Sequence, residues 1–163
     1  MLQQAAIDGL AFARTAGVLK GRLGLESMPR LAQSGCSGSV LDFVLAGEMD
    51  DRGRPGLKIG VDGSVRLQCQ RCLGEVEVLL RLEAQLKLAA SEAEILAADD
   101  DLDRVLADRA MSVAVLVEDE VILALPMSPR HDQCRAAAGS DGGAEPSPFQ
   151  ALAALKKRSF GGG

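Results

Sequence analysis

The chain has 163 residues, of which 47% are hydrophobic and 25% are charged, a composition typical of one soluble domain with enough apolar side chains for a core. The formal net charge is −5, so the field of the whole molecule repels the phosphates of nucleic acid. Aromatic residues make up only 2%, with neither Trp nor Tyr. This shortage argues against holding single-stranded nucleic acid by stacking its bases on aromatic rings.

The first residues, MLQQAAIDGLAFAR, do not have the charged and apolar regions of a secretion signal, and no apolar run approaches the length of a membrane span. We therefore expect a cytoplasmic protein without a membrane partner. In a reducing compartment the cysteines are expected to be thiols or metal ligands, not a disulfide framework. They are Cys36, Cys69, Cys72 and Cys134.

Short elements are expected in the N-terminal part. Asp8 can cap a helix over Gly9–Thr15, and a second short helix is expected over Glu26–Gln33, where Pro29 is tolerated in the first turn. The apolar run within Ser39–Glu48 predicts a strand, and the polar segment MDDRGRPG closes it.

The strongest pattern is a pair of amphipathic strands over residues 57–69 and 75–88. Apolar residues occupy the odd positions of the first segment and the even positions of the second. A turn at Asp62-Gly63 would split the apolar residues between two faces, so we reject it. A two-residue turn at Gln70-Arg71 keeps them on one face and places the CxxC motif at the tip of a long hairpin. Gly60 and Gly63 are expected to mark a bend.

That turn also predicts the cross-strand pairs. On the apolar face it opposes Cys69 to Cys72, Val65 to Val76, Val61 to Leu80 and Ile59 to Leu82. On the other face it matches opposite charges, Arg66 with Glu75 and Lys58 with Glu83, each worth about 0.2–1 kcal/mol.

The segment Ser91–Asp108 is acidic and only loosely periodic, which predicts a helix with frayed ends or partial disorder. Ser112 can cap a helix over residues 112–124, with Glu118 and Asp119 projecting outward, and Pro126 ends it. Residues 136–146 have the composition of a flexible linker, and 147–163 are expected to hold a helix over 148–157 and a tail. The fold class is therefore α+β: one domain over 1–135, with an antiparallel sheet built around the hairpin and packed helices.

Cys69 and Cys72 admit three interpretations. With His131 and Cys134 of PRHDQC they would complete a Cys3His site for one structural zinc ion, which would hold the hairpin tip to the segment after the 112–124 helix. A thioredoxin-like redox pair is the second, but that motif opens a helix, and here a strand follows. In the third, the thiols pack as small apolar residues. Cys36 stands alone among Ser and Gly.

No enzyme or small-molecule substrate is expected, because the chain has one histidine, no GxSxG, no phosphate-binding glycine loop and no Ser/His/Asp grouping. Glu118, Asp119 and Glu120 could act as acid and base but are expected to form a solvated helix face. They close a stretch, Glu92–Glu120, with ten acidic and two basic residues, leaving 16 basic and 13 acidic elsewhere. A solvated surface or a docking site for a basic partner would explain this stretch.

Three blocks together resemble the YceD-type family, which is linked to accumulation of large-subunit ribosomal RNA. The blocks are LxCxRCL at Leu67–Leu73, VEDEVILALPMSPRH at Val117–His131 followed by Cys134, and SPFQALAALK near the C-terminus. The resemblance implies a cytoplasmic, non-enzymatic role in synthesis, processing or stability of 23S rRNA during large-subunit assembly. Carried over by position, the blocks point to Cys69, Arg71, Cys72, Glu118, Asp119, Glu120, Pro126, Pro129, His131 and Cys134.

Two hypotheses for partners follow. Arg66, Arg71, Arg130 and Arg135 would form a local basic patch if the hairpin tip and PRHDQC converge, and this patch could contact 23S rRNA or a pre-ribosomal particle directly. Alternatively, the protein is a zinc-stapled adaptor that docks a basic ribosomal protein through its acidic segment without touching RNA.

Overall fold

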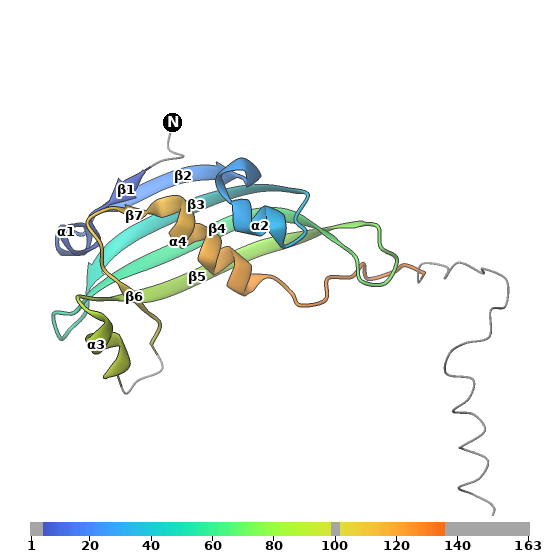
Figure 1. Ribbon diagram of the computed structural model, residues 1–163. Helices are drawn as coiled ribbons and strands as arrows, with labels where there is room; N and C mark the ends of the chain where they lie inside the picture. The colour runs from blue at the N-terminus through green and yellow to red at the C-terminus, as the bar shows by residue number, and fades with distance from the viewer. Residues whose placement is uncertain (1–4, 99–101, 136–163) are drawn as a thin grey trace, which may run out of the picture.

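A computed structural model describes residues 5–98 and 102–135 of the chain. Figure 1 shows a curved five-stranded sheet in the order β2-β3-β4-β5-β6 and a separate pair, β1 with β7. The elements are β1 (Ala6–Ile7), α1 (Gly9–Arg14), β2 (Val18–Gly24), η1 (Leu25–Ser27), α2 (Pro29–Gln33), β3 (Gly38–Met49), β4 (Pro55–Gln68), β5 (Glu75–Ala89), α3 (Glu92–Leu96), β6 (Arg104–Leu106), β7 (Met111–Ser112) and α4 (Val113–Ala124). The α+β class is confirmed. The large sheet is antiparallel except at β6, which runs parallel to β5.

The hairpin of β4 and β5 is confirmed, with the apolar sets of both strands on one face of the sheet. Its pairing differs from the prediction: Gln68 lies opposite Glu75, and Val65 lies opposite Val78 instead of Val76. The strands are joined by the loop Cys69–Gly74 and not by a two-residue turn. Two-residue hairpin turns are of type I′ or II′, and both types require φ > 0 at the first central residue, a conformation that Gln70 disfavours.

The predicted charge pairs are therefore only partly formed. Arg66 lies directly opposite Glu77 in the ladder but still reaches the Glu75 carboxylate diagonally, at 3.4 Å. Lys58 lies opposite Gln85, and its Nζ contacts Glu48 of β3 at 3.0 Å instead of Glu83.

Gly63 explains how so long a strand curves. Its φ is +155°, and a Cβ at this position would collide with the carbonyl oxygen of Val40 on β3. Only glycine adopts this backbone freely, so the close approach of the two strands depends on it. Gly60 meets no atom within 4 Å of an added Cβ, so the constraint lies at Gly63.

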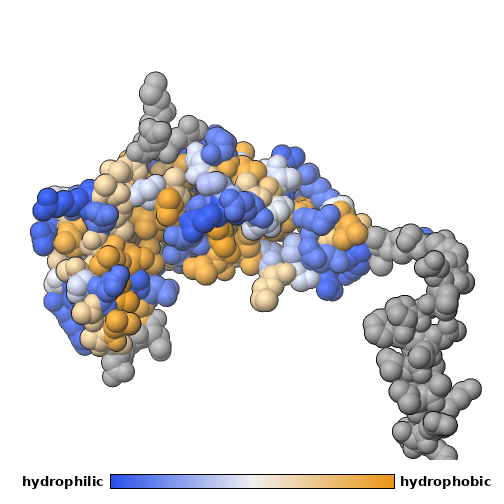
Figure 2. Space-filling view, in the orientation of Figure 1, coloured by the Kyte–Doolittle hydropathy of each residue, from blue (hydrophilic) through white to orange (hydrophobic). Residues whose placement is uncertain are grey.

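Helices cover one face of the sheet, and α2 and α4 lie side by side across it in Figure 1. Ser112 caps α4 as predicted, accepting a hydrogen bond from the Val115 N–H at 3.4 Å. Val117 and Val121 of α4 are fully buried against the sheet, where Phe43 and Ile59 also lie. Figure 2 shows apolar side chains reaching the surface near the end of α4, where Leu123 is 78% exposed.

Glu118 corrects the prediction for α4. It was expected to project outward, but only 1% of it is exposed. Its Oε1 accepts hydrogen bonds from the N–H groups of Arg30 at 2.6 Å and Leu31 at 2.9 Å, and its Oε2 accepts one from Arg30 Nε at 3.1 Å. The first N–H groups of a helix lack partners within it, so this carboxylate satisfies the start of α2 and ties α2 to α4.

The N-terminal part contains two strands that were not predicted, β1 and β2. The helix capped by Asp8 is confirmed as α1, and the strand over Ser39–Glu48 is confirmed as β3. The helix expected over Glu26–Gln33 is divided into η1 and α2 at Met28, because Pro29 begins α2. The strand β2 has a visible period of two in VLKGRLG, with Leu23 buried and Arg22 exposed.

The acidic segment after the hairpin contains the short helix α3, capped by Ser91, and the short strand β6. The linker predicted over 136–146 and the helix predicted over 148–157 lie outside the described residues. Among the helices of the described residues, none has both the length and the apolar character needed to cross a membrane.

Candidate metal centre

The tip of the hairpin is shaped by two backbone hydrogen bonds around Cys69. Its N–H donates to the Gly74 carbonyl at 2.8 Å, and its carbonyl accepts from the Leu73 N–H at 2.9 Å. Leu73 closes the loop in the left-handed region, with φ of 61°, a conformation that is uncommon for a residue other than glycine. This tight loop brings Cys69 and Cys72 toward one point.

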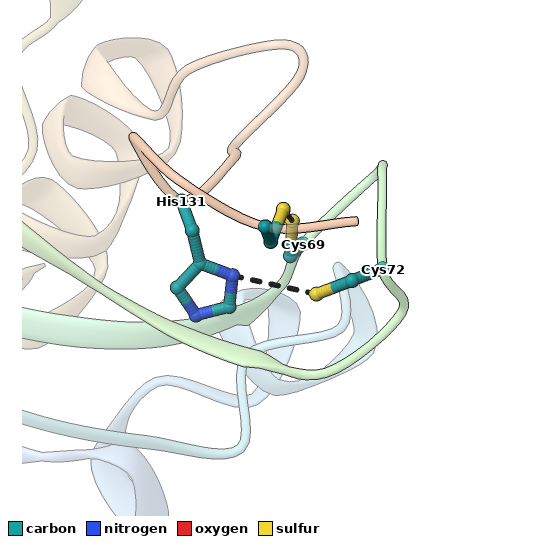
Figure 3. A group of neighbouring side chains, drawn as sticks. Cys69, Cys72 and His131 are labelled. Carbon is teal, nitrogen blue, oxygen red and sulfur yellow. Dashed lines mark hydrogen bonds between the residues drawn. The ribbon is translucent and has the colours of Figure 1, made fainter. Parts of the chain in front are cut away.

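The segment after α4 crosses the tip and adds two more candidate ligands. It is held there by the Gln70 N–H, which donates to the Pro129 carbonyl at 2.8 Å. Figure 3 shows the His131 ring from this segment pointing at the Cys72 sulfur, with Cys69 beside them. The ligand atoms of Cys69, Cys72, His131 and Cys134 all lie within 4.8 Å of one another, so the predicted convergence of the four residues is confirmed.

Two of the distances between these atoms match those around a tetrahedral zinc ion. Zinc bonds of about 2.3 Å to sulfur and about 2.0–2.1 Å to nitrogen place two sulfurs about 3.8 Å apart and a sulfur and a nitrogen about 3.5 Å apart. The Sγ atoms of Cys69 and Cys134 are 3.8 Å apart, and Cys72 Sγ lies 3.4 Å from His131 Nδ1. A zinc ion could therefore be held with little rearrangement.

The histidine has the orientation of a metal ligand. Its Nε2 lies 2.9 Å from the Glu75 carbonyl oxygen, which can only accept, so Nε2 carries the proton. In the neutral imidazole Nδ1 then carries no hydrogen, and it lies 3.4 Å from Cys72 Sγ. Metal-binding histidines commonly donate the other ring N–H to a backbone carbonyl in this way.

The thiols differ in their electrostatic surroundings. Burial raises the pKa of Cys69, but hydrogen bonds from the backbone N–H groups of Cys72, Arg71 and His131 outweigh it and lower that pKa to about 5. The pKa of Cys134 is raised, first by burial and then by the neighbouring thiols of Cys69 and Cys72. The loop thus favours a thiolate at Cys69, the form that binds metals.

The predicted arginines are distributed around this cluster. Arg71 donates from its guanidinium to the Cys134 carbonyl at 3.3 Å, and Arg130 donates to Ser128 Oγ at 3.2 Å. Arg130 and Arg135 are exposed, while Arg66 lies below the tip and pairs with Glu75. An exposed apolar residue that was not predicted, Leu73, stands among them at 56% exposure.

The acidic triplet of α4 is engaged elsewhere. Glu118 is buried against α2, which removes it from the candidate contact residues, and Asp119 forms an ion pair with Arg30. The pKa of Glu120 is raised by burial and then by the charges of Asp103 and Asp119.

The structure supports one of the three interpretations of the cysteines more than the other two. A strand follows the CxxC motif, so neither thiol gains the helix dipole that lowers the thiol pKa in thioredoxin-like proteins. Packing as small apolar residues fits the full burial of Cys69 but does not account for Cys72 and Cys134, which are half-buried beside an imidazole. The metal site accounts for all four side chains.

Comparison with known proteins gives one finding. No curated protein and no solved structure matches the chain. A family model described as "Large ribosomal RNA subunit accumulation protein YceD" matches residues 57–156, a stretch that holds all but the first two residues of the hairpin, α4 and all four clustered side chains. The chain therefore belongs to the YceD family of large ribosomal RNA subunit accumulation proteins.

Proposed function

We propose that the protein acts in the cytoplasm as a non-enzymatic factor supporting synthesis, processing or stability of 23S rRNA during large-subunit assembly. In this proposal the hairpin tip, stapled by one zinc ion, contacts the RNA. The observation that carries it is the convergence of Cys69, Cys72, His131 and Cys134 at a tip surrounded by arginines. A structural metal ion would hold two segments distant in sequence as one rigid surface.

The contact would be made to phosphates more than to bases. The chain has no Trp or Tyr and only four Phe, so few rings are available on which bases could stack. Arg130 and Arg135 are exposed beside the metal cluster, and guanidinium groups suit bidentate contact with phosphate oxygens. Because the whole chain is acidic, such binding depends on this local patch.

The experiment is binding of the full-length protein to 23S rRNA across a range of salt concentrations. We expect affinity to fall steeply with salt, and the double variant Arg71→Ala with Arg130→Ala to reduce the slope of log K against log salt by about 2. Arg22→Ala is the matched control, because Arg22 is an arginine on β2 that pairs with Asp42 and lies outside the tip. Equal losses in both variants, or binding without salt dependence, would reject the tip as the RNA contact.

The adaptor hypothesis remains a second candidate. It is supported by the raised pKa of Glu120, whose carboxylate lies near the charges of Asp103 and Asp119 and could be neutralised by a basic partner. A ribosomal protein that co-purifies after nuclease treatment, and is lost on Glu120→Gln but retained by the double arginine variant, would favour it.

A further inference from the structure

One long edge of the sheet has no neighbouring strand over most of its length. β5 pairs with β4 from Glu75 to Lys87, but on its other side it pairs with β6 only over Lys87–Ala89. Figure 1 shows β6 at one end of β5 only, and along the rest of β5 no further strand of the described residues lies beside it. An edge of this length can accept another strand.

The hydrogen-bonding groups on this edge belong to the odd-numbered residues. In an antiparallel pair, alternate residues direct their N–H and C=O groups toward the partner strand. The N–H of Cys69 bonds the Gly74 carbonyl, so even positions of β5 face β4. In agreement, the Lys87 N–H and the Glu75 carbonyl point outward, to Asp103 and His131. The groups of Glu77, Leu79 and Arg81 therefore face the free edge.

Leu79 interrupts a row of charges on this edge. Natural edge strands avoid pairing by placing charges along the edge, and Glu77, Arg81 and Glu83 are charged here, but Leu79 between them is 80% exposed. It is flanked by one acidic and one basic residue. Glu77 accepts a hydrogen bond from Ser64 at 2.7 Å, and Arg81 donates to Asp62 at 2.8 Å, so both side chains are held on the same face as Leu79.

We infer that this edge is a dimerisation surface, on which β5 of a second copy of the chain pairs antiparallel with β5 around a two-fold axis at Leu79. The axis places Leu79 against Leu79 of the second copy. It also places Glu77 opposite Arg81 twice, once on each side of the axis. The surface is thus complementary to itself, as a two-fold interface requires.

Other positions of the axis give poorer pairings. An axis at Leu80 sets Glu77 against Glu83 and Leu79 against Arg81, and an axis at Arg81 sets that arginine against itself. Like charges directly opposite each other destabilise a sheet. An axis at Val78 sets Leu79 against Glu77 and leaves the apolar side chain without an apolar neighbour.

The face of the sheet that the helices cover supports the same position of the two-fold axis. Val78, Leu82 and Ala84 of β5 are only half-buried within one copy, because no strand of residues 5–98 and 102–135 extends the apolar layer past this part of the edge. With the axis at Leu79, Val78 lies opposite Leu80 and Val76 lies opposite Leu82. The apolar layer then continues from one copy into the next. The next pair outward from this axis would be Glu75 with Glu83, which carry like charges, but the Glu75 carbonyl is already occupied by His131, so the ladder ends before this pair.

The test is sedimentation velocity on the full-length protein from low to high micromolar concentration. A small interface of this kind is expected to dissociate in the micromolar range. Leu79→Lys places two ammonium groups face to face and should raise the dissociation constant about tenfold or more. Val40→Lys is the matched control, because Val40 is an exposed valine, at 58%, on the interior strand β3. Since Leu79 is exposed, its replacement leaves the core intact, which circular dichroism checks.

A charge exchange tests the register. Arg81→Glu alone should weaken the dimer, and adding Glu77→Arg should restore it to within about threefold of the original affinity. A chain that stays monomeric throughout the micromolar range would overturn the inference. So would a dimer that tolerates Leu79→Lys but is lost on Val18→Lys, which would place the interface at β2, or a dimer that the charge exchange does not rescue.

Discussion

His131 donates its Nε2 hydrogen to the Glu75 carbonyl, 2.9 Å away, and thereby leaves Nδ1 facing the thiols of the hairpin tip. This bond joins the segment after α4 to the first residue of β5. It fixes the tautomer that a metal needs at Nδ1, so the histidine is oriented by backbone that the hairpin itself supplies.

Removing the metal should open the tip and leave the rest of the sheet closed. The segment after α4 meets the tip through few direct bonds, among them Gln70 to Pro129 and Arg71 to Cys134. We expect a strong chelator to raise hydrogen exchange over residues 66–77 and 128–134 while β2 and β3 stay protected. Cys36→Ser, a cysteine outside the cluster, serves as the control and should respond to the chelator as the unaltered chain does. Unchanged exchange at the tip would mean that no metal holds it.

Glu118→Ala should be strongly destabilising. It leaves the N–H groups of Arg30 and Leu31 without their buried acceptor, and we expect a loss of about 2–3 kcal/mol in the free energy of unfolding measured by urea. Asp119→Ala is the matched control, since Asp119 pairs with the same arginine but is half-exposed; it should lose less than about 1 kcal/mol. Equal losses for the two variants would contradict the role assigned to Glu118.

Glu120→Gln should stabilise the protein at neutral pH. Burial, Asp103 and Asp119 raise the pKa of Glu120, so its ionised form is less stable in the folded chain than in the unfolded one. Stability from this group is present below its unfolded pKa of about 4.3 and is lost as the pH rises through the folded pKa. The thermal midpoint of Glu120→Gln should exceed that of the unaltered chain at pH 7, and the difference should vanish at pH 4. A lower midpoint at pH 7 would contradict the assignment.

Gly63→Ala should destabilise the sheet, and Gly60→Ala should not. Alanine at position 63 would face the Val40 carbonyl with φ of +155°, and strain of this kind costs about 1–3 kcal/mol. At position 60 an added Cβ meets nothing within 4 Å, so the smaller entropy of unfolded alanine should leave stability equal or slightly higher. Urea denaturation of both variants measures the contrast, and comparable losses would contradict it.

The hairpin could be predicted because a period of two determines which face each side chain occupies, whatever the turn. The register of the hairpin could not be predicted, because it depends on the loop. In that loop Leu73 adopts a left-handed conformation that its residue type does not predict. The period-two pattern of β2 was present in VLKGRLG but short. Because it spans only seven residues, two of them glycine, this pattern did not predict a strand.

The convergence of the four candidate metal ligands could also be predicted, because a CxxC tip and an HxxC segment contain the only histidine and three of the four cysteines. The burial of Glu118 could not. Its position on α4 is compatible with a solvated face, and only the packing of α2 supplies the N–H donors that make burial favourable. The partner of a charged residue on a helix can be identified only when the position of the neighbouring element is known.

We expect Cys69, Cys72, His131 and Cys134 to hold one zinc ion. Elemental analysis of protein purified without added metal tests it most directly, with Cys69→Ser and Cys36→Ser measured beside the unaltered chain. We expect about one zinc ion per chain in the unaltered protein and in Cys36→Ser, and a large loss in Cys69→Ser. Zinc near zero in all three proteins, or zinc unaffected by Cys69→Ser, would contradict the account.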